Sequence, residues 1–588
     1  MPGLQEWIYS IEVGRGASIV RAVLAGLVFI AVAVVYDIRC YKNFSSSEAM
    51  DSAQLGRALA EGKGYHTLFV RPVSVSMLKK RQGDSFLKRP HPDLANAPAY
   101  PVVLAGLTRL LPFRFEIPEL AHRNFLTYSP EVWIAVFNQF LFFCAVILTF
   151  LLASILFDRA VGWMAAIIFA GTELFWRFSV SGLPTMLLLL VFLGVLCCLV
   201  FLERSAAAEQ VSTPRLLSGA CGLGALMALG TLTRYSFGWL IIPVLIFLIL
   251  YGSVWRVMVA ALVLLVFAGC LAPWLVRNYR LCGALFGTAG YAVSQGTHFF
   301  PNNELERSLD PSRELTQISF ADYGRKFLVN SREIVREALP KFGGNWMSAF
   351  FLAGLLIRFN HPTLSRIRVF LVSSLILLIV VQAFGRTHLT SENPEINSEN
   401  LLVLMAPILF VYGVGCFFIL FGQMSLLHPQ WRQPIMAMVC LLASAPLIFA
   451  VLPPRSLPTA YPPYWPPGIQ GVSKYMKEKE LMMSDMPWAV AWYGQRQCCW
   501  LTLNPRSDFF KINDEMKPVQ GLYLTLLTLD QKFLSDIVRD KQSWGRFVRD
   551  LFWKGEPPAG FPLRKSPGLS DRLFLTDWER WKVTESSP

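Results

Sequence analysis

Two acidic residues one helical turn apart are the pair in this chain best suited to chemistry. Glu48 and Asp51 lie in the segment SSSEAMDSAQLGRALAEGKGYHTLFVRP, which starts at Ser45. Residues at i and i+3 share one face of a helix, and a carboxylate held there can act as a general base. A plainer interpretation is that Ser45–Ser47 cap the helix while the acids stabilise its N-terminal dipole. Both interpretations predict a helix that ends in the glycine-containing turn EGKGY.

Basic and aromatic residues follow the acidic pair in the same segment. Arg71 comes first, then a run of lysines and arginines, then HPDLANAPAYP with His91 and Tyr100. Cationic groups there can hold a phosphate through charge-assisted hydrogen bonds, although simple solvation of a polar loop explains them as well.

Two further arginine motifs lie at the ends of apolar runs. LTRYSFG contains Arg234, and PWLVRNYRLCG contains Arg277 and Asn278. Such arginines can extend their side chains to the lipid headgroups. If several converged on one membrane face, they would instead form an anion pocket.

The composition indicates that lipid surrounds most of the chain. Of 588 residues, 54% are hydrophobic and only 16% are charged, against about 25% charged in soluble domains. The net charge of +14 fits basic residues beside membrane spans. Because no basic-aromatic module or zinc spacing occurs, we expect no nucleic-acid partner.

The hydropathy pattern predicts a mainly α, polytopic membrane helix bundle with about eleven spans. The expected spans are 17–36, 132–157, 161–178, 183–202, 215–233, 236–252, 255–275, 344–358, 366–385, 400–421 and 434–452. The stretch Ala99–Leu111 is too short to span the bilayer comfortably and is expected to lie at the membrane interface.

Charge placement predicts the orientation of the bundle. Short linkers on one side carry Arg159, Arg204, Arg256 and Arg432, which puts them and the N-terminus in the cytoplasm. The long loops 37–131 and 276–343 and the tail 453–588 are then external. The N-terminus has no cleavage site and is expected to remain as an anchor.

The tail has a different character from the bundle. Its start, YPPYWPPGIQ (Tyr461–Gln470), predicts a stiff, extended proline-rich linker. Strand patterns at 480–484, 498–503, 521–529 and 571–578 alternate with helical ones and predict a small extracytoplasmic α/β domain. We therefore divide the chain into a transmembrane module, 1–452, and a periplasmic α/β domain, 453–588.

Several cofactor classes lack their sequence motifs. The eleven cysteines form no CxxC or Cys/His metal pattern, and most of them lie in apolar runs. No GxGxxG or Walker motif occurs, so a nucleotide is not expected. No cofactor is assigned; a divalent cation stays open.

The motifs taken together resemble those of bacterial GT-C superfamily membrane glycosyltransferases. They are the acidic first loop with its LAEGKGY turn, the HP…P-x-YP segment, the LTR motif and PW-x-x-RNY-x-x-x-G. The resemblance is to relatives of the dolichyl-phosphate-mannose:protein mannosyltransferases and of the aminoarabinose transferase that modifies lipid A. It covers about residues 17–452.

The resemblance implies a reaction and its residues. A sugar on a polyprenyl phosphate would be transferred, with inversion, to a lipid, glycan or protein acceptor at the external face. A carboxylate in the first loop would be the base. Counting back from Arg57 gives Glu48, whereas the family's usual aspartate favours Asp51, so both stay candidates. The lipid phosphate and substrate would be bound by Arg71, His91, Tyr100, Arg234, Arg277 and Asn278.

The chain departs from the family pattern at one place. Many members have an Arg-Tyr pair before a late span, where this chain has Asn400 and Leu401. Arg386 and His388, in the preceding loop, are the candidates to replace it.

Three other function classes remain as alternatives. A transporter or flippase would place charges inside the spans, and these spans are nearly free of them. A glycan ligase or polymerase of the cell envelope would use a diphosphate-linked glycan. In a non-catalytic membrane scaffold, the acidic pair would be dispensable.

Overall fold

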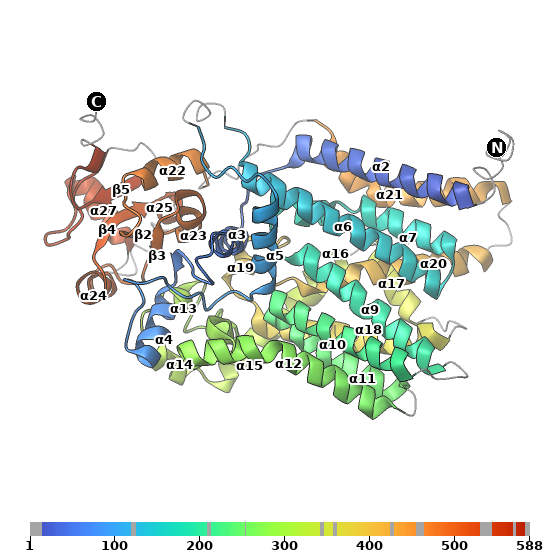
Figure 1. Cartoon of the computed structure of the whole chain (residues 1–588). Coiled ribbons are helices and arrows are strands. Elements are labelled where there is room, and N and C mark those ends of the chain that lie inside the picture. Colours follow the sequence, from blue (N-terminus) through green and yellow to red (C-terminus); the bar gives the residue numbers. More distant parts are fainter. Residues whose placement is uncertain are drawn as a thin grey trace.

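The computed structural model describes residues 15–118, 125–207, 213–252, 255–341, 346–356, 362–423, 429–453, 464–529, 544–567 and 572–581. In Figure 1 the long helices lie side by side, and the tail lies at one end of this bundle. Helix α2 begins at the other end of the bundle. The expected fold class, a helical membrane bundle with an α/β domain, is confirmed.

Eight helices within the described residues are long and apolar enough to cross a membrane. They are α2 (Arg15–Cys40), α6 (Ser129–Leu156), α9 (Thr185–Ala207), α10 (Thr213–Thr233), α12 (Arg256–Cys282), α18 (Pro362–Gly385), the joined η5 and α20 (Leu401–Met405 and Ala406–Gln423), and α21 (Arg432–Val451). These helices indicate a multi-pass membrane protein.

Three of the eleven expected spans are not among these eight helices. The third is split at Thr172, whose extended backbone separates α7 (Arg159–Gly171) from α8 (Glu173–Val180). The sixth starts as a 3-10 turn, η2 (Tyr235–Leu240), before α11 (Ile241–Tyr251). For the eighth, α17 covers Trp346–Leu356 and its flanks lie outside the described residues.

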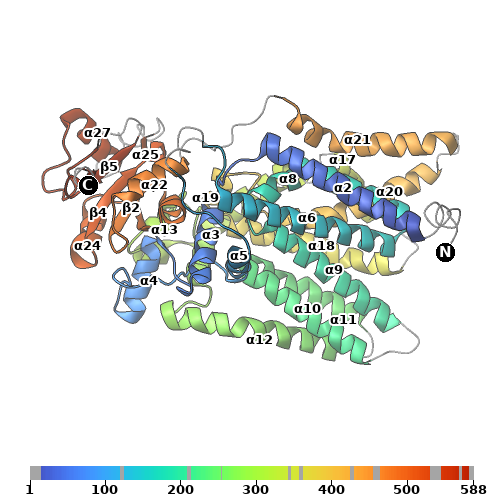
Figure 2. The ribbon, with the colours of Figure 1, turned by 45° about the horizontal axis from the view of Figure 1, so that its top comes forward.

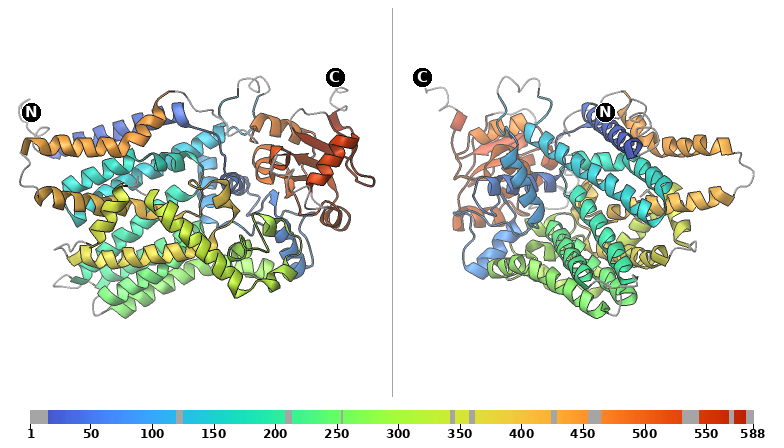
Figure 3. Two further views of the ribbon diagram at one scale, coloured as in Figure 1. Left: turned by 180° about the vertical axis from the view of Figure 1, so that it is seen from behind. Right: turned by 45° about the vertical axis from the view of Figure 1, so that its right-hand side comes forward.

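The bundle has a buried interior and a lipid-accessible edge. Helix α10 packs against α9 and α12, and α6 packs against α7 and α9. Helices α2 and α21 contact each other and lie on the outside of the bundle (Figures 2 and 3). Their large apolar side chains, such as Leu24 and Leu441, are exposed, as lipid contact requires.

The loop 37–131 is folded into its own elements at the end of the bundle. These are α3 (Ser47–Ala60), β1 (Phe69–Val70), α4 (Pro72–Gln82) and α5 (Ala99–Leu110). The predicted turn after α3 uses Gly62 and Gly64, both at positive φ, where glycine is favoured. Gly56 lets α3 approach α5, because a Cβ there would lie 2.8 Å from the Cβ of Leu104.

The loop 276–343 and the segment after α18 are mostly short helices. They contain η3 (Gly287–Val293), α13 (Glu304–Arg307), α14 (Ser312–Gln317), α15 (Phe320–Glu333), the π-turn η4 (Ile334–Ala338), α16 (Leu339–Lys341) and α19 (His388–Glu392). The short η6 (Pro429–Trp431) lies elsewhere, between α20 and α21. Lys326 on α15 fixes η3, since its ammonium donates to the carbonyls of Ala292 (2.8 Å) and Gln295.

Four strands of the tail belong to a five-stranded sheet in the order β1-β3-β2-β4-β5. Strands β2 (Leu481–Ser484), β3 (Gln497–Trp500) and β4 (Val519–Leu524) are parallel to one another, and β5 (Leu573–Thr576) is antiparallel to β4. The helical elements are α22 (Pro466–Lys474), α23 (Pro487–Ala489), η7 (Val490–Gly494), α24 (Ser507–Glu515), α25 (Leu526–Leu529) and α27 (Trp544–Lys554).

One of the two edge strands, β1, comes from the first loop and not from the tail. Strand β1 of the first loop pairs in parallel with β3, with Phe69 opposite Cys498 and Val70 opposite Cys499. The carboxyl ends of four parallel strands therefore point the same way, and Arg71 follows directly after β1. In α/β sheets, this edge is where ligands usually bind.

Two expectations for the tail need correction. The proline-rich segment is not extended from Pro466 onward, because prolines at the start of α22 suit the first helical turn; residues 461–463 lie outside the described residues. The strand expected to reach Leu529 ends at Leu524, where Thr525 turns the chain into α25.

A buried carboxylate joins the tail to the bundle. Glu131, at the start of α6, is fully buried and accepts hydrogen bonds from Trp492 Nε1 (2.8 Å), the Tyr493 hydroxyl (2.6 Å) and the Phe44 amide (2.8 Å). Since all three partners are buried, this junction fixes the tail above the bundle.

Candidate active site

The acidic pair lies on α3 at the junction of bundle, loops and tail. Ser46 is the N-cap of α3, but its side chain makes no capping bond. Glu48 and Asp51 have distinct partners, so helix capping does not account for both. Each carboxylate is bound by one of the predicted arginines.

Glu48 belongs to a network with Arg234, which directly follows α10. The Arg234 guanidinium donates to Glu48 Oε1 at 2.9 Å, and the Ser398 hydroxyl donates to the same oxygen at 2.5 Å. Arg234 also bonds Ser398 and lies 4.0 Å from Glu399. Glu48 is 18% exposed as a side chain.

Glu399 is the second carboxylate of this network and is buried. It accepts bonds from the Thr387 amide (3.0 Å), the Thr387 hydroxyl (2.5 Å) and the Thr390 hydroxyl (2.6 Å). These bonds satisfy the carboxyl oxygens away from water and hold the loop 386–400 together. The bond from Arg234 to Ser398 links that loop to the end of α10.

Asp51 belongs to a second network around Arg71. Arg71 donates to Asp51 Oδ2 at 2.8 Å and to Glu306 Oε2 at 3.1 Å, and lies 3.9 Å from Asp93. Asn96 Nδ2 donates to the same Asp51 oxygen at 2.7 Å. Asp51 is 1% exposed, so its carboxylate is buried among these partners and shielded from solvent.

The charges around Arg71 influence one another. Burial and the Asp51 carboxylate raise the pKa of Asp93 to about 6, although Arg71 opposes this shift. Burial alone would lower the pKa of the Arg71 guanidinium, but the three carboxylates raise it above its ordinary value. Arg71 is therefore always charged and is the counter-ion of the whole group.

A cavity of about 1090 Å³ joins both networks to the membrane helices. Its polar end is lined by Glu48, Arg71 and Arg234, among others. Its apolar wall comes from α11, α12 and α18, with side chains such as Ile241, Phe267, Leu271, Leu377 and Val381. Trp488 and Trp500 of the tail also line it. Asp51 does not line the cavity.

The remaining predicted site residues divide into two groups. Tyr100 and His388 line the cavity; the Tyr100 hydroxyl donates to the Gly182 carbonyl at 2.9 Å. His91, Arg277, Asn278 and Arg386 do not line it. Burial lowers the pKa of His91 to about 4, so its ring is neutral near pH 7.

Arg277 holds the first loop in place, and Asn278 holds the start of the second loop. Arg277 donates to the Asp93 carbonyl (2.9 Å) and stacks over Trp274, 4.5 Å from the ring centre. Asn278 is fully buried and donates to the Leu285 carbonyl. Arg386 pairs with Glu333 at 2.8 Å. The structure thus gives Arg277 contacts to the loop backbone instead of a place beside Arg234.

Sequence reasoning missed Ser398, Glu399, Asn96 and Glu306. The first two lie in the polar segment SENPEINSEN before a long apolar run, a pattern like that of Glu48 after the first span. Nothing local in the sequence distinguishes Glu306.

Among the described residues, no group of three or more His, Cys, Asp or Glu side chains is arranged to hold a metal ion.

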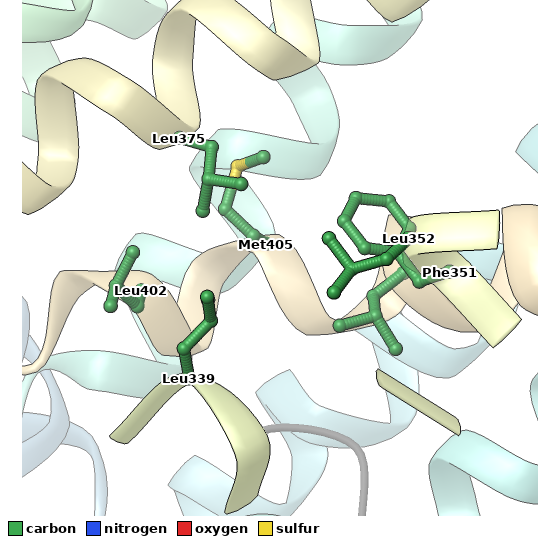
Figure 4. A pocket seen from close by; sticks show the side chains of 7 residues that line it. Leu339, Phe351, Leu352, Leu375, Leu402 and Met405 are labelled. Atoms are coloured by element: carbon green, nitrogen blue, oxygen red, sulfur yellow. The ribbon is translucent and has the colours of Figure 1, made fainter. Parts of the chain in front are cut away.

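A second, small cavity of about 20 Å³ beside α20 is lined by apolar side chains such as Leu339, Phe351 and Met405 (Figure 4). It is a packing void, because it offers no polar group to a ligand.

Comparison with known proteins identifies the fold. No protein-family model and no curated protein matches the chain. Archaeal oligosaccharyltransferase AglB from Archaeoglobus fulgidus, in complex with an inhibitory peptide and a dolichol-phosphate, is 11% identical with a TM-score of 0.52. That match covers 86% of this chain and 70% of AglB.

A second structure matches nearly the whole chain. ArnT from Cupriavidus metallidurans, bound to undecaprenyl phosphate, is 10% identical with a TM-score of 0.51, and the match covers 95% of this chain and 98% of ArnT. The resemblance to GT-C membrane glycosyltransferases expected from the motifs is confirmed at the level of the fold.

Proposed function

We propose that this chain, which has the fold of the GT-C membrane glycosyltransferases, transfers a sugar from a polyprenyl phosphate to an acceptor. One observation carries the proposal: a single cavity combines an apolar wall between membrane helices with a polar end holding a carboxylate and two arginines. A lipid phosphate needs both parts. The dolichol-phosphate and undecaprenyl phosphate in the two similar structures support this class of donor.

Glu48 is the general base in this proposal, because it lines the cavity whereas Asp51 does not. The base takes the proton of the acceptor hydroxyl as its oxygen attacks the anomeric carbon. The bond from that carbon to the phosphate oxygen breaks, and the polyprenyl phosphate leaves with the electron pair. Attack opposite the leaving group inverts the anomeric configuration.

Arg234 stabilises the leaving phosphate. A guanidinium has five N–H donors, and Arg234 uses some of them on Glu48 and Ser398. Its Nε has no partner within the described residues. Arg234 can thus bind a phosphate oxygen while it still positions Glu48, and it provides the preorganised positive charge that catalysis of this kind requires.

The proposal also assigns a membrane orientation to the bundle and a place in the site to the tail. The N-terminus is cytoplasmic and the polar end of the cavity faces the outside of a bacterial inner membrane, where the tail, 453–588, covers it. The α/β tail contributes Trp488 and Trp500 to the cavity, so it is part of the site. A transporter would need no carboxylate beside the phosphate; a glycan ligase would use the same parts with a diphosphate donor.

The test is a transfer assay with the purified protein in nanodiscs. Undecaprenyl phosphates carrying glucose, mannose or galactose are supplied with cell-envelope lipid and glycan fractions, and release of undecaprenyl phosphate is measured. Glu48→Gln should slow release by about 10²- to 10⁴-fold. Glu61→Gln, at the exposed end of the same helix, is the matched control.

Two outcomes would count against the proposal. If no lipid phosphate is released from any donor by the unmodified protein, the glycosyltransferase assignment is wrong. If Glu48→Gln retains the full rate while Asp51→Asn loses it and stays folded, the base is Asp51.

A further inference from the structure

One polar corner of the cavity extends beyond the two arginine networks and shares only Glu306 with the network of Arg71. It is formed by Gln295 and Glu306 of the second loop, His388 after α18, and Trp500 at the carboxyl end of β3. We call these four residues the polar corner. They come from three distant parts of the chain, so the corner exists only in the folded protein.

Hydrogen bonds in the polar corner are incomplete. Gln295 is 3% exposed; its Nε2 donates to Glu306 Oε1 at 3.0 Å, but its Oε1 has no partner within the described residues. His388 is 7% exposed, and its Nδ1 likewise lacks a partner there. Buried polar atoms are nearly always satisfied, because leaving one unpaired is costly. A bound group can supply both missing partners.

The chemistry of the corner selects the kind of group. Burial raises the pKa of Glu306, but Arg71, His388 and Gln295 lower it more, so the net shift is downward and the carboxylate is ionised. Glu306 and Gln295 Oε1 therefore offer hydrogen-bond acceptors. Phosphate oxygens are repelled by such acceptors, and a lipid tail has no donor to offer them. Hydroxyl groups, in contrast, can donate hydrogen bonds to these acceptors.

The corner is directly connected to both networks of the active site. Glu306 bonds Arg71 at 3.1 Å, and Arg71 bonds Asp51 on α3. His388 follows Thr387, whose hydroxyl binds Glu399 beside Arg234. A ligand whose phosphate contacts Arg234 would therefore reach this corner with the group next to that phosphate.

We propose that the polar corner binds hydroxyl groups of the sugar carried by the lipid phosphate, and that Gln295 and His388 contribute to sugar specificity. This inference rests on the proposed function. Lys326 holds the backbone of Gln295 in position through the Gln295 carbonyl, and Trp500 closes the corner, 5.8 Å from the His388 ring.

The experiment separates sugar binding from lipid-phosphate binding. Affinities of the full-length protein in nanodiscs are measured for undecaprenyl phosphate and for the same lipid carrying glucose, mannose or galactose. The variants are Gln295→Met and His388→Phe, which keep volume and remove the polar atoms. Gln317→Met and His298→Phe, at exposed positions outside the cavity, are the matched controls.

The expected result is specific to the sugar. At least one glycolipid should bind the unmodified protein more tightly than undecaprenyl phosphate, and each variant should lose about three- to tenfold of that affinity. Binding of undecaprenyl phosphate should be unchanged in both variants, which also shows that they are folded.

Other results overturn the inference in distinguishable ways. If undecaprenyl phosphate does not bind the unmodified protein, the proposed function fails and the inference fails with it. If it binds but the sugars add no affinity, or if the variants lose lipid and glycolipid binding equally, the sugar assignment alone is wrong.

Discussion

Replacing Arg71 with methionine should destabilise the protein in a strongly pH-dependent way. Arg71 is the shared partner of Asp51 at 2.8 Å, Glu306 at 3.1 Å and Asp93 at 3.9 Å. Methionine fills much of the same volume but leaves three acidic side chains close together without their counter-ion. Removing one partner of a buried ion pair costs about 3–5 kcal/mol.

This cost can be converted into a melting temperature. With about 2.1 cal/mol/K of unfolding entropy per residue, a chain of 588 residues unfolding as one unit would lose about 2–4 °C. Helices that persist in the unfolded membrane state lower that entropy and enlarge the shift.

The sign of the pH dependence follows from the carboxyl groups. Without Arg71, Asp93 and Glu306 lose the charge that lowers their pKa, and the pKa of Asp93 is already about 6 because of burial and Asp51. An acid whose pKa is raised in the folded state contributes stability at low pH that is lost as pH rises through that pKa. The variant should thus be close to the unmodified protein at pH 5 and least stable, relative to it, at pH 8.

Thermal unfolding in detergent at pH 5 and pH 8 measures this effect. Arg89→Met is the matched control, since Arg89 lies in the same loop, 3.6 Å from Asp84, with 72% of its side chain exposed. The reasoning is refuted if Arg71→Met loses the same stability at both pH values, or no more than Arg89→Met.

Further predictions concern the contacts that join the parts of the chain. Glu131→Ala should leave three buried donors unpaired, at about 1–3 kcal/mol each, and make the tail sensitive to limited proteolysis. Glu131→Gln keeps one oxygen to accept from Trp492 and Tyr493 but loses the acceptor for the Phe44 amide, so it should be less sensitive than Glu131→Ala; equal sensitivity would contradict the docking role. Gly287→Ala should lower thermal stability, because its Cβ would lie 2.0 Å from the Leu94 carbonyl oxygen at a φ of 56°; Gly290→Ala, with open space around it, should not. Arg307→Met should loosen the second loop from the tail, since Arg307 donates to the Leu501 carbonyl at 2.6 Å; hydrogen exchange of residues 301–308 should rise, and unchanged exchange would contradict this.

Sequence patterns predicted the membrane helices well because lipid imposes a long apolar run on each span. They failed where a span is built from two pieces. At Thr172 the backbone is extended, and at the η2–α11 junction a 3-10 helix continues as an α-helix; hydropathy alone reports neither change of backbone conformation. The strands of the tail were recognised by their apolar runs, but the start of a helix at Pro466 was read as an extended linker.

The sequence named several residues that meet at the candidate site, but it did not predict which acid pairs with which arginine. Glu48, Asp51, Arg71 and Arg234 were all identified, but which acid pairs with which arginine depends on helix positions that no local pattern contains. Arg277 was a candidate to bind the lipid phosphate, and the structure shows its guanidinium donating to the loop backbone.

The strand contributed by the first loop has a consequence for how the chain is made. Phe69 pairs with Cys498, so β1 leaves the ribosome long before the strand beside which it belongs. Contacts this distant in sequence form late and slowly, and the first loop must wait, with Arg71 at its strand end, until nearly the whole chain has been synthesised. A nascent or prematurely terminated chain would hold its membrane helices without the finished sheet edge beside the cavity, so translation itself delays completion of the candidate site until the last domain is present.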